Sequence, residues 1–529
     1  MDEHNIIMED QYISLRYSRN LAEGAGLVFN LGERVEGFSN PLWVFLMAPA
    51  FLLKIDALFF NRMLCLLFGF AHFPLMVAIM RKHSSDRAPS VVGMFPAILI
   101  ALSFPFLFWM KSGMETVFAS FLLLSAGYLL ITRKYLWSSV VFGLLALTRP
   151  EGIIYMATAP LFIFLNEDDD IAGKIFKSLL PGILIFSCYE VFRIVYFSAW
   201  LPNSFHAKVS VDSLHQKLRG TMYYGSWFFG IRGFVLLVAL VLLARKMEWM
   251  KSSVVWLGAV VLNAFFVIAV GGDYLPYSRF IVAVMPAFAL VLGIGILSIY
   301  KIDGAGGNNF VRQAFAIAVI VGAFFLHPDT PRHLKATRYA LSMPSDLPVP
   351  APTIRERWKD FLGEKREQPN LFVGQWMRDN IEENSDVAMD QCGIIPYISK
   401  LKTIDLFGLM SPLMVKTAPD EKPGLLMSMN PSYILLVFYI DPPFATYLPG
   451  LFATKGFVED YCVRAFLVSD KYRRGNPGYV LFESAEESAS CVPPPPANSE
   501  NEVLAWLKKS INGDSSNVFT WDYSYDIFR

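Results

Sequence analysis

Two adjacent carboxylates stand near the start of the chain, in the stretch "MEDQYISLRYSRNLAEG" (residues 8–24). A carboxylate within hydrogen-bond reach of a hydroxyl group can take its proton, so Glu9 and Asp10 are candidates for a general base. The same pair, with a third acid at Asp273, could hold a hard divalent cation, although no EF-hand or HExxH spacing is present. A simpler interpretation is that Asp10 caps a helix over residues 11–23.

Further polar residues follow the ends of apolar runs, where we expect them to gather at one face of a membrane. Such groups are costly to place in a bilayer protein and commonly mark a functional site. Each also has a simpler interpretation, because Glu115 could be a solvated charge, Arg149 and Glu151 a surface ion pair, and Lys208 an interfacial side chain. The candidate set is Glu115, Arg149, Glu151, Arg193, Asn203, His206, Lys208, Asp273 and Arg279.

The composition identifies the elements that must position these residues. The 529 residues are 54% hydrophobic and 17% charged, and the mean hydropathy is +0.41. These values are typical of a polytopic membrane protein. The 46 basic residues balance 46 acidic ones, so no nucleic-acid partner is expected. Five scattered cysteines are compatible with one disulfide at most, in the C-terminal part.

Ten apolar runs could each span or nearly span the hydrocarbon core, which predicts a membrane all-α bundle. The segment over residues 40–55 is interrupted by two prolines and predicts an interfacial helix. The runs lie at about residues 58–80, 90–109, 114–132, 137–148, 152–165, 177–197, 221–243, 252–270, 279–300 and 311–326.

Loop charges predict the orientation of these spans. Lys and Arg gather on alternate loops, such as residues 81–87 and 245–251, which are therefore expected in the cytoplasm. The acidic pair, the candidate polar residues and everything after about residue 327 then lie outside the cytoplasmic membrane. An outside N-terminus needs a preceding span, so we expect an eleventh helix upstream of Met1.

Changes in composition and hydrophobic periodicity along the chain predict the domain boundaries. Residues 1–57 form a first extracytoplasmic loop and residues 58–327 the transmembrane domain. A Pro-rich linker over 328–352 leads to an extracytoplasmic α/β domain over 353–485, where helical and strand-like patterns alternate. Residues 486–529 are expected to be a tail.

Several stretches of the chain resemble a known family. Residues 9–43, "EDQYISLRYSRNLAEGAGLVFNLGERVEGFSNPLW", are similar to the first outer loop of GT-C glycosyltransferases of the mycobacterial terminal arabinofuranosyltransferase type. The family pattern there runs roughly DDAxISxRYxRNLxxGxGLVFNxGERVEGYTNPLW. The blocks "SGMET", "LTRPEG", "LPNSFHAK", "GGDYLPYSRF" and "DQCGIIPYISKLKTIDLFGL" follow in the family's order.

The resemblance implies a GT-C fold and an integral-membrane enzyme. Such an enzyme takes a single sugar, arabinofuranose being one candidate, from a polyprenyl-phosphate donor and transfers it to a cell-envelope glycan, lipid or protein acceptor. The family's acidic pair corresponds to Glu9 and Asp10. Its first acid is usually Asp, so the identity of the base stays open, as does the need for a divalent cation.

In such an enzyme the donor's phosphate and sugar would contact the candidate polar residues. Arg149, Arg193, Lys208 and Arg279 could hold phosphate, with His206 as a further donor. Tyr12 and Trp43 suit either stacking on a sugar ring or a position at the level of the lipid headgroups.

Two other functions are compatible with the sequence. An oligosaccharide or polysaccharide ligase or polymerase also uses polyprenyl-linked sugars, whereas a lipid-linked sugar transporter should show repeated halves, which are not evident. No Walker A loop or GxGxxG segment after a strand indicates a nucleotide-activated donor.

Overall fold

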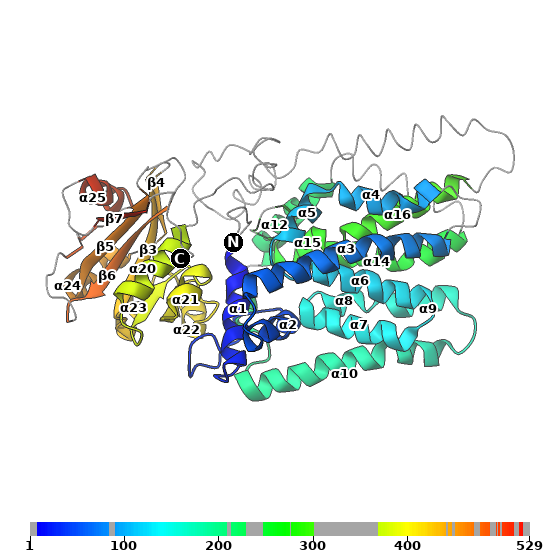
Figure 1. Ribbon diagram of the computed structural model, residues 1–529, viewed down its shortest axis with the longest axis horizontal. Coiled ribbons are helices and arrows are strands. Elements are labelled where there is room, and N and C mark those ends of the chain that lie inside the picture. Colours follow the sequence, from blue (N-terminus) through cyan, green and yellow to red (C-terminus); the bar gives the residue numbers. More distant parts are fainter. Residues whose placement is uncertain are drawn as a thin grey trace.

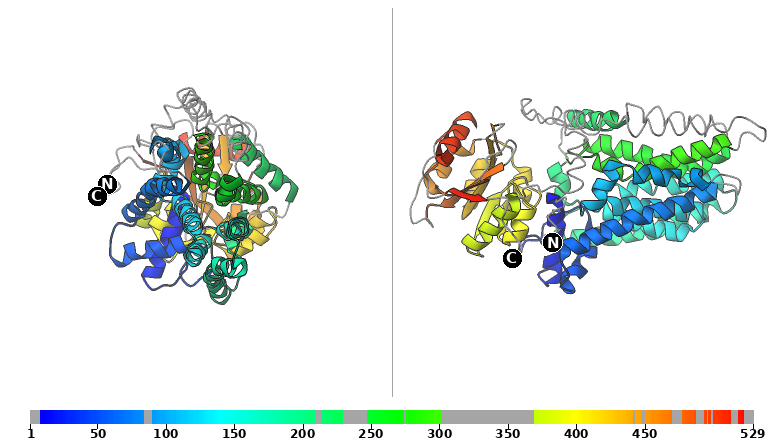
Figure 2. Two further views of the ribbon diagram at one scale, coloured as in Figure 1. Left: turned by 90° about the vertical axis from the view of Figure 1, so that its right-hand side faces the viewer. Right: turned by 45° about the horizontal axis from the view of Figure 1, so that its top comes forward.

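The computed structural model describes residues 8–83, 90–208, 213–228, 247–273, 275, 277–300, 369–440, 443–446, 450–469, 477–486, 493–494, 496–497, 500–512 and 518–521. These residues form a helical bundle and an α/β unit, with helix α1 (Glu9–Ala22) between them (Figures 1 and 2). The predicted linker, the predicted span over 311–326 and most of the predicted span over 221–243 lie outside the described residues.

The long apolar helices of the bundle run roughly along one axis (Figure 1). Its helices are α2 (Pro41–Leu52), α3 (Ala57–His83), α4 (Ser90–Ala101), α5 (Phe104–Lys111), α6 (Thr116–Ile131), α7 (Tyr135–Thr148), α8 (Gly152–Tyr155), α9 (Thr158–Asn166), α10 (Ile171–Phe197), α11 (Asn203–Lys208), α12 (Ser213–Phe228), α14 (Met247–Val270), α15 (Arg279–Val282) and α16 (Met285–Tyr300).

Three described helices are long and apolar enough to cross a membrane, namely α3, α10 and residues Ser253–Val270 of α14. Helices α4 and α5 make a fourth if they form one span, which is bent by 64° at the break between them. Helices α6 and α7 lie where the sequence predicts spans but are shorter. The membrane helical fold is therefore present, while the count of ten spans stays a prediction.

Helices α7 and α10 pack closely because two glycines face each other. A Cβ atom added to Gly143 would lie 2.9 Å from the Cα atom of Gly182. The backbone N–H of Gly182 also donates to Ser139 Oγ, at 2.9 Å. Small residues allow such close approach between membrane helices. This contact fixes α10, which carries Arg193 near its C-terminal end.

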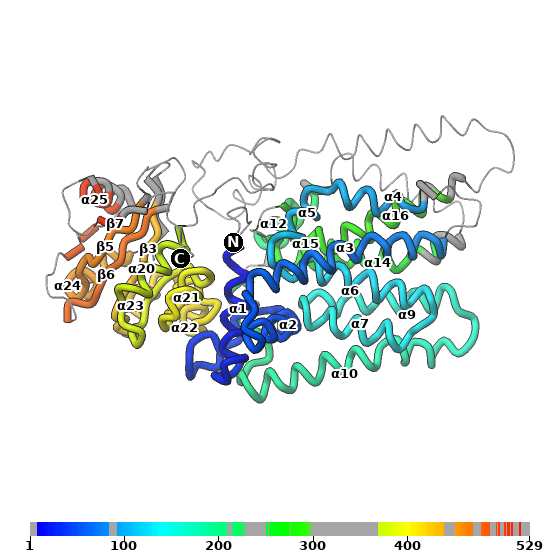
Figure 3. The backbone as a smooth tube through the Cα atoms, viewed as in Figure 1, coloured from blue at the N-terminus to red at the C-terminus, as the bar shows by residue number. Residues whose placement is uncertain are grey.

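Helix α1 differs from the bundle helices because it is polar and yet mostly buried. It stands across the axes of the long helices, and α2 lies beside it (Figure 3). The residue before the helix is Met8, which has extended backbone angles, so Asp10 lies inside the first turn. The interpretation of Asp10 as the cap of a helix over residues 11–23 is therefore wrong.

The α/β unit contains a seven-stranded sheet with the order β2-β1-β3-β6-β5-β7, and β4 also pairs with β3. Its elements are α20 (Pro369–Asn380), β1 (Asp386–Met389), α21 (Ile394–Ser399), β2 (Lys402–Asp405), α22 (Pro412–Lys416), α23 (Lys422–Met429), β3 (Tyr433–Ile440), β4 (Pro443–Thr446), a 3₁₀ helix (Leu451–Ala453), α24 (Lys455–Asp460), β5 (Tyr461–Ser469), β6 (Pro477–Ser484), α25 (Glu500–Asn512) and β7 (Val518–Trp521).

The sheet is mixed, and it reaches further along the chain than the sequence indicates. Strand β1 pairs in parallel with β2 and β3, β6 runs antiparallel to β3 and β5, and β7 runs parallel to β5. Apolar side chains pack on both of its faces. Because β7 belongs to the sheet, the α/β unit continues past residue 485, the boundary where the sequence predicts a tail.

The glycine contact between α7 and α10 generates a stability prediction. Gly143→Val should force α10 away, because the added carbons overlap its backbone, and overpacking of this kind costs about 1–3 kcal/mol. Thermal unfolding of detergent-solubilised protein should show a lower Tm. Gly93→Val is the matched control, since a Cβ atom there meets nothing within 4 Å. Equal Tm values for the two variants would contradict the packing argument.

Candidate active site

The two adjacent acids of α1 contact different parts of the molecule. Successive side chains on an α-helix point about 100° apart, so neighbours in sequence need not share a face. Glu9 contacts the α/β unit, whereas Asp10 lies near cationic side chains of the bundle. The sequence pair is therefore divided into two separate environments.

Asp10 lies between two cations at the end of the bundle that faces the α/β unit. Its Oδ2 atom is 3.8 Å from Arg279 Nη1 and 4.0 Å from Lys208 Nζ. These separations exceed hydrogen-bond length, so the pairs are electrostatic contacts that can rearrange. The Asp10 side chain is 16% exposed and that of Lys208 is 35% exposed, so both can be reached from solvent.

A sharp turn places Arg279 at this position. Gly271 and Gly272 both have positive φ, which a residue with a side chain rarely adopts. The turn leads to Asp273, whose Oδ2 atom accepts a hydrogen bond from Arg279 Nε at 2.6 Å. Both side chains are buried. Asp273 therefore holds one edge of the guanidinium group while the other edge faces Asp10.

A second, buried cluster surrounds Arg149. Its guanidinium group pairs with Glu115, at 2.8 Å, and with Glu151. Asn40 donates to the second Glu115 oxygen at 2.9 Å and also hydrogen-bonds to Ser14 of α1. The Arg149–Glu151 pair exists as the sequence suggests, but it is buried rather than on the surface. Two carboxylates already neutralise Arg149, and the cluster joins α1 to the bundle.

A third cluster joins the first loop to α10. Arg193 Nε donates to Glu36, and the Tyr189 hydroxyl donates to the other Glu36 oxygen at 2.7 Å. Arg193 also pairs with Glu190. Burial raises the pKa of Glu36, although the hydrogen bond from Arg193 opposes that shift. Like Arg149, Arg193 is therefore already matched by carboxylates.

The remaining candidates from the loop after α10 have other surroundings. Asn203 donates to the carbonyl oxygens of Gly408 and Leu409, at 2.6 and 2.9 Å, and so joins the bundle to the α/β unit. His206 is exposed and its ring packs against that of Phe205. Of the predicted set, the structure brings Asp10, Lys208, Asp273 and Arg279 together. The buried Arg149 cluster adjoins this group, because the guanidinium groups of Arg149 and Arg279 both contact the ring of Phe280.

Tyr12 and Trp43 do not lie where a sugar ring could stack on them. Each is 1% exposed. The ring of Tyr12 meets Tyr397 edge-on, and the ring of Trp43 packs against Phe118. Both aromatic side chains belong to the hydrophobic core, so the predicted stacking role is not supported by their positions.

Glu9 is held by groups that sequence reasoning missed. Its Oε1 atom accepts a hydrogen bond from the backbone N–H of Ile394 at 2.8 Å, and its Oε2 atom accepts one from Asn370 Nδ2 at 3.0 Å. The block around residue 394 stands out by its resemblance, but no local signal indicates that it pairs with Glu9. Asn370 lies outside every recognised block.

No set of metal ligands accompanies the acids within the part of the chain that the structure describes. No group of three or more His, Cys, Asp or Glu side chains there is close enough to hold a metal ion. Asp273, the expected third ligand, hydrogen-bonds to Arg279 instead. The described side chains that pair with the Asp10 carboxylate are therefore the cations Lys208 and Arg279 rather than further acids.

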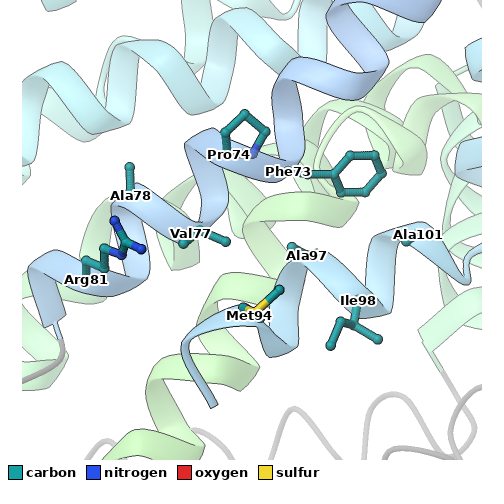
Figure 4. Close-up of a pocket in the computed structure, with 9 residues that line it drawn as sticks. All are labelled: Phe73, Pro74, Val77, Ala78, Arg81, Met94, Ala97, Ile98 and Ala101. Atoms are coloured by element: carbon teal, nitrogen blue, oxygen red, sulfur yellow. The ribbon is translucent and has the colours of Figure 1, made fainter. Parts of the chain in front are cut away.

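A pocket of about 450 Å³ lies elsewhere, between α3 and α4 (Figure 4). Arg81 is its one charged lining residue, and its other lining residues are Phe73, Pro74, Val77, Ala78, Met94, Ala97, Ile98 and Ala101. No member of the candidate site lines it. The pocket is therefore separate from the acidic pair.

The relatives of this chain agree with the resemblance seen in its sequence. The chain is 23% identical over 455 residues to a terminal β-(1→2)-arabinofuranosyltransferase of Corynebacterium glutamicum, covering 74% of this chain and 60% of that protein. It is 28% identical over 369 residues to the Mycobacterium tuberculosis protein of the same description, covering 58% and 54%. The resemblance to terminal arabinofuranosyltransferases is confirmed. The chain spans little more than half the length of these relatives.

Solved structures confirm the coarser part of the predicted fold class, a membrane helical fold with a C-terminal domain. ArnT from Cupriavidus metallidurans, solved with undecaprenyl phosphate, matches with a TM-score of 0.53 and 11% identity over 91% of this chain and 94% of ArnT. The apo oligosaccharyltransferase of Archaeoglobus fulgidus matches with a TM-score of 0.52 and 11% identity over 92% and 71%. Residues 357–483 match a domain of unknown function, DUF8728. The chain thus shares with these solved structures a membrane helical fold with a C-terminal domain.

The Arg149 cluster generates a second stability prediction. Arg149→Met should leave two buried carboxylates without their cation, which costs about 3–5 kcal/mol. We expect a lower Tm and a lower yield of folded protein. Arg133→Met is the matched control, because Arg133 also pairs with a carboxylate but its side chain is 69% exposed. Exposed pairs contribute about 0–1 kcal/mol, so an equal loss in both variants would contradict the assignment.

Proposed function

We propose that this chain is an integral-membrane glycosyltransferase that moves a single sugar from a polyprenyl-phosphate donor to an acceptor outside the cytoplasmic membrane. The observation that carries the proposal is the position of Asp10 between Lys208 and Arg279. A carboxylate beside two cations suits a reaction in which a hydroxyl group loses a proton and a phosphate leaves.

Asp10 is the proposed general base. The acceptor oxygen attacks the anomeric carbon of the donor sugar, and its proton passes to the Asp10 carboxylate. The bond between the anomeric carbon and the phosphate oxygen breaks, with its electron pair going to the phosphate. Asp10 suits this role because its side chain is partly exposed and lies beside the two cations.

Lys208 and Arg279 are proposed to hold the donor phosphate. The leaving phosphate carries negative charge, so it is stabilised by cations placed in advance. Asp273 anchors Arg279 through Nε, which leaves the outer edge of the guanidinium group directed toward Asp10. Arg149 and Arg193 are less suited to this role, because their ion pairs are with carboxylates other than Asp10.

The donor and acceptor classes are supported by relatives. ArnT, which shares the fold, was solved bound to undecaprenyl phosphate. The curated relatives are named as arabinofuranosyltransferases. We therefore propose a polyprenyl-phosphate donor, with arabinofuranose as the first sugar to test and a cell-envelope glycan as the first acceptor.

An orientation with the site outside the cytoplasmic membrane is part of the proposal. The loop charges support it, because Lys and Arg gather on the opposite set of loops. Cys462 of β5 is disulfide-bonded, and disulfides persist mainly in oxidising compartments. Both observations favour an extracytoplasmic α/β unit.

The test is transfer of radiolabelled sugar from synthetic polyprenyl-phosphate donors by membranes containing the chain. Asp10→Asn removes the base and should lower transfer by about 10²–10⁴-fold. Lys208→Met should lower it by a smaller factor, because Arg279 still contacts the phosphate. Glu23→Gln is the matched control, since Glu23 is an exposed acid at the other end of α1.

Equal transfer by wild type and Asp10→Asn would contradict the assignment of the base. Transfer from an oligosaccharide pyrophosphate donor, with none from single-sugar donors, would instead support a ligase. No transfer from any donor, with donor movement across the membrane, would support a transporter.

A further inference from the structure

Helix α1 meets the α/β unit along a series of matched hydrogen bonds. At its N-terminal end the Glu9 carboxylate accepts from Ile394 N–H and from Asn370. Two turns further along, Arg16 donates to the carbonyl oxygens of Pro396 and Leu401, at 2.7 and 2.8 Å. A carboxylate thus meets N–H donors while a guanidinium group meets carbonyl acceptors, which fixes the register of α1 against residues 394–401.

The contact at Glu9 is close enough to require glycine opposite it. A Cβ atom added to Gly393 would lie 2.3 Å from the Glu9 carbonyl oxygen and 2.8 Å from Glu9 Cγ. Atoms without a bond between them cannot approach so closely. The backbone at Gly393 therefore lies directly against the first turn of α1, next to Asp10.

The hydrogen-bond partner of Glu9 is itself held in place. The Asn370 side-chain oxygen accepts from the Tyr479 hydroxyl of β6, and its nitrogen also lies 3.3 Å from the Gln391 side-chain oxygen. Asn370 is therefore oriented with its N–H groups toward Glu9. This series of hydrogen bonds connects β6, a central strand of the sheet, to the first turn of α1.

We propose that Glu9 is a positioning residue that couples the α/β unit to the catalytic helix and thereby holds Asp10 between Lys208 and Arg279. This inference rests on the proposed function of Asp10 and deepens it. It also explains a departure from the family pattern, in which Asp usually precedes the second acid. The extra methylene of glutamate lets the carboxylate reach both Ile394 and Asn370.

Burial also changes the protonation of Glu9. Burial raises the pKa of Glu9 to about 7, although the hydrogen bonds from Asn370 and Ile394 lower it. The neighbouring titratable groups are Asp10, Tyr12 and Cys392. The pKa of the Glu9 carboxyl in contact with the α/β unit is higher than the ordinary value of 4.5, so the contact favours the protonated carboxyl. The contact is therefore strongest at low pH and weakens as the pH rises through about 7.

The test compares Glu9→Asp with Glu9→Gln in the full chain. Aspartate keeps the acid but is too short to reach the α/β unit, so transfer should fall by about tenfold or more, mainly in kcat, as displaced catalytic groups do. Glutamine keeps the length and one acceptor for Ile394 N–H but loses the acceptor for Asn370, so it should retain more activity than aspartate does. A general base would give the opposite order.

Hydrogen exchange supplies a readout that does not depend on the reaction. Peptides that contain the Ile394 amide should exchange faster in Glu9→Asp than in wild type and nearly as slowly in Glu9→Gln. Gly393→Ala should produce the same faster exchange and loss of transfer with Glu9 intact. Gly424→Ala is its matched control, because a Cβ atom there meets nothing within 4 Å.

Two outcomes would overturn the inference. Loss of transfer in Glu9→Gln with unchanged exchange would make Glu9 a participant in the chemistry, and wild-type exchange in Glu9→Asp would show that the contact is not needed. If the wild type transfers no sugar, the proposed function fails, while the exchange comparison still decides whether Glu9 holds the α/β unit on α1.

Discussion

The structure depends on one constraint, which is that the polar helix α1 is buried between an apolar bundle and an α/β unit. Buried polar groups are costly unless they are hydrogen-bonded. Ser14 is joined to Asn40 in the Arg149 cluster, Arg16 to backbone carbonyls of the α/β unit, and Glu9 to Ile394 N–H. These hydrogen bonds fix the position and orientation of α1. Asp10 is thereby held next to Lys208 and Arg279.

The same requirement divides the cations into two kinds. Arg149 and Arg193 are each neutralised by two carboxylates, so they hold elements together. Arg279 is also held by a carboxylate, that of Asp273 at 2.6 Å, but it approaches Asp10 at 3.8 Å, and Lys208 approaches Asp10 at 4.0 Å. Contact with Asp10, rather than burial or charge, therefore distinguishes the two cations proposed to bind a substrate anion.

Much of the architecture could be predicted from the sequence. Hydropathy identified the apolar helices, and the motif around Glu9 and Asp10 identified the family resemblance and the candidate acidic pair. The partners of Glu9 could not be predicted, because Asn370 and Ile394 lie more than 350 residues away and carry no local pattern. The burial of Tyr12 and Trp43 was missed for a related reason, since an aromatic side chain suits a core as well as a sugar site.

The most direct test of the account is a cryo-EM structure of the chain in a lipid nanodisc with undecaprenyl phosphate. The account predicts ordered phosphate density in contact with the Lys208 ammonium and Arg279 guanidinium groups, with the Asp10 carboxylate beside it. Phosphate bound instead at Arg149 or Arg193, with Lys208 and Arg279 unoccupied, would contradict the assignment of this site.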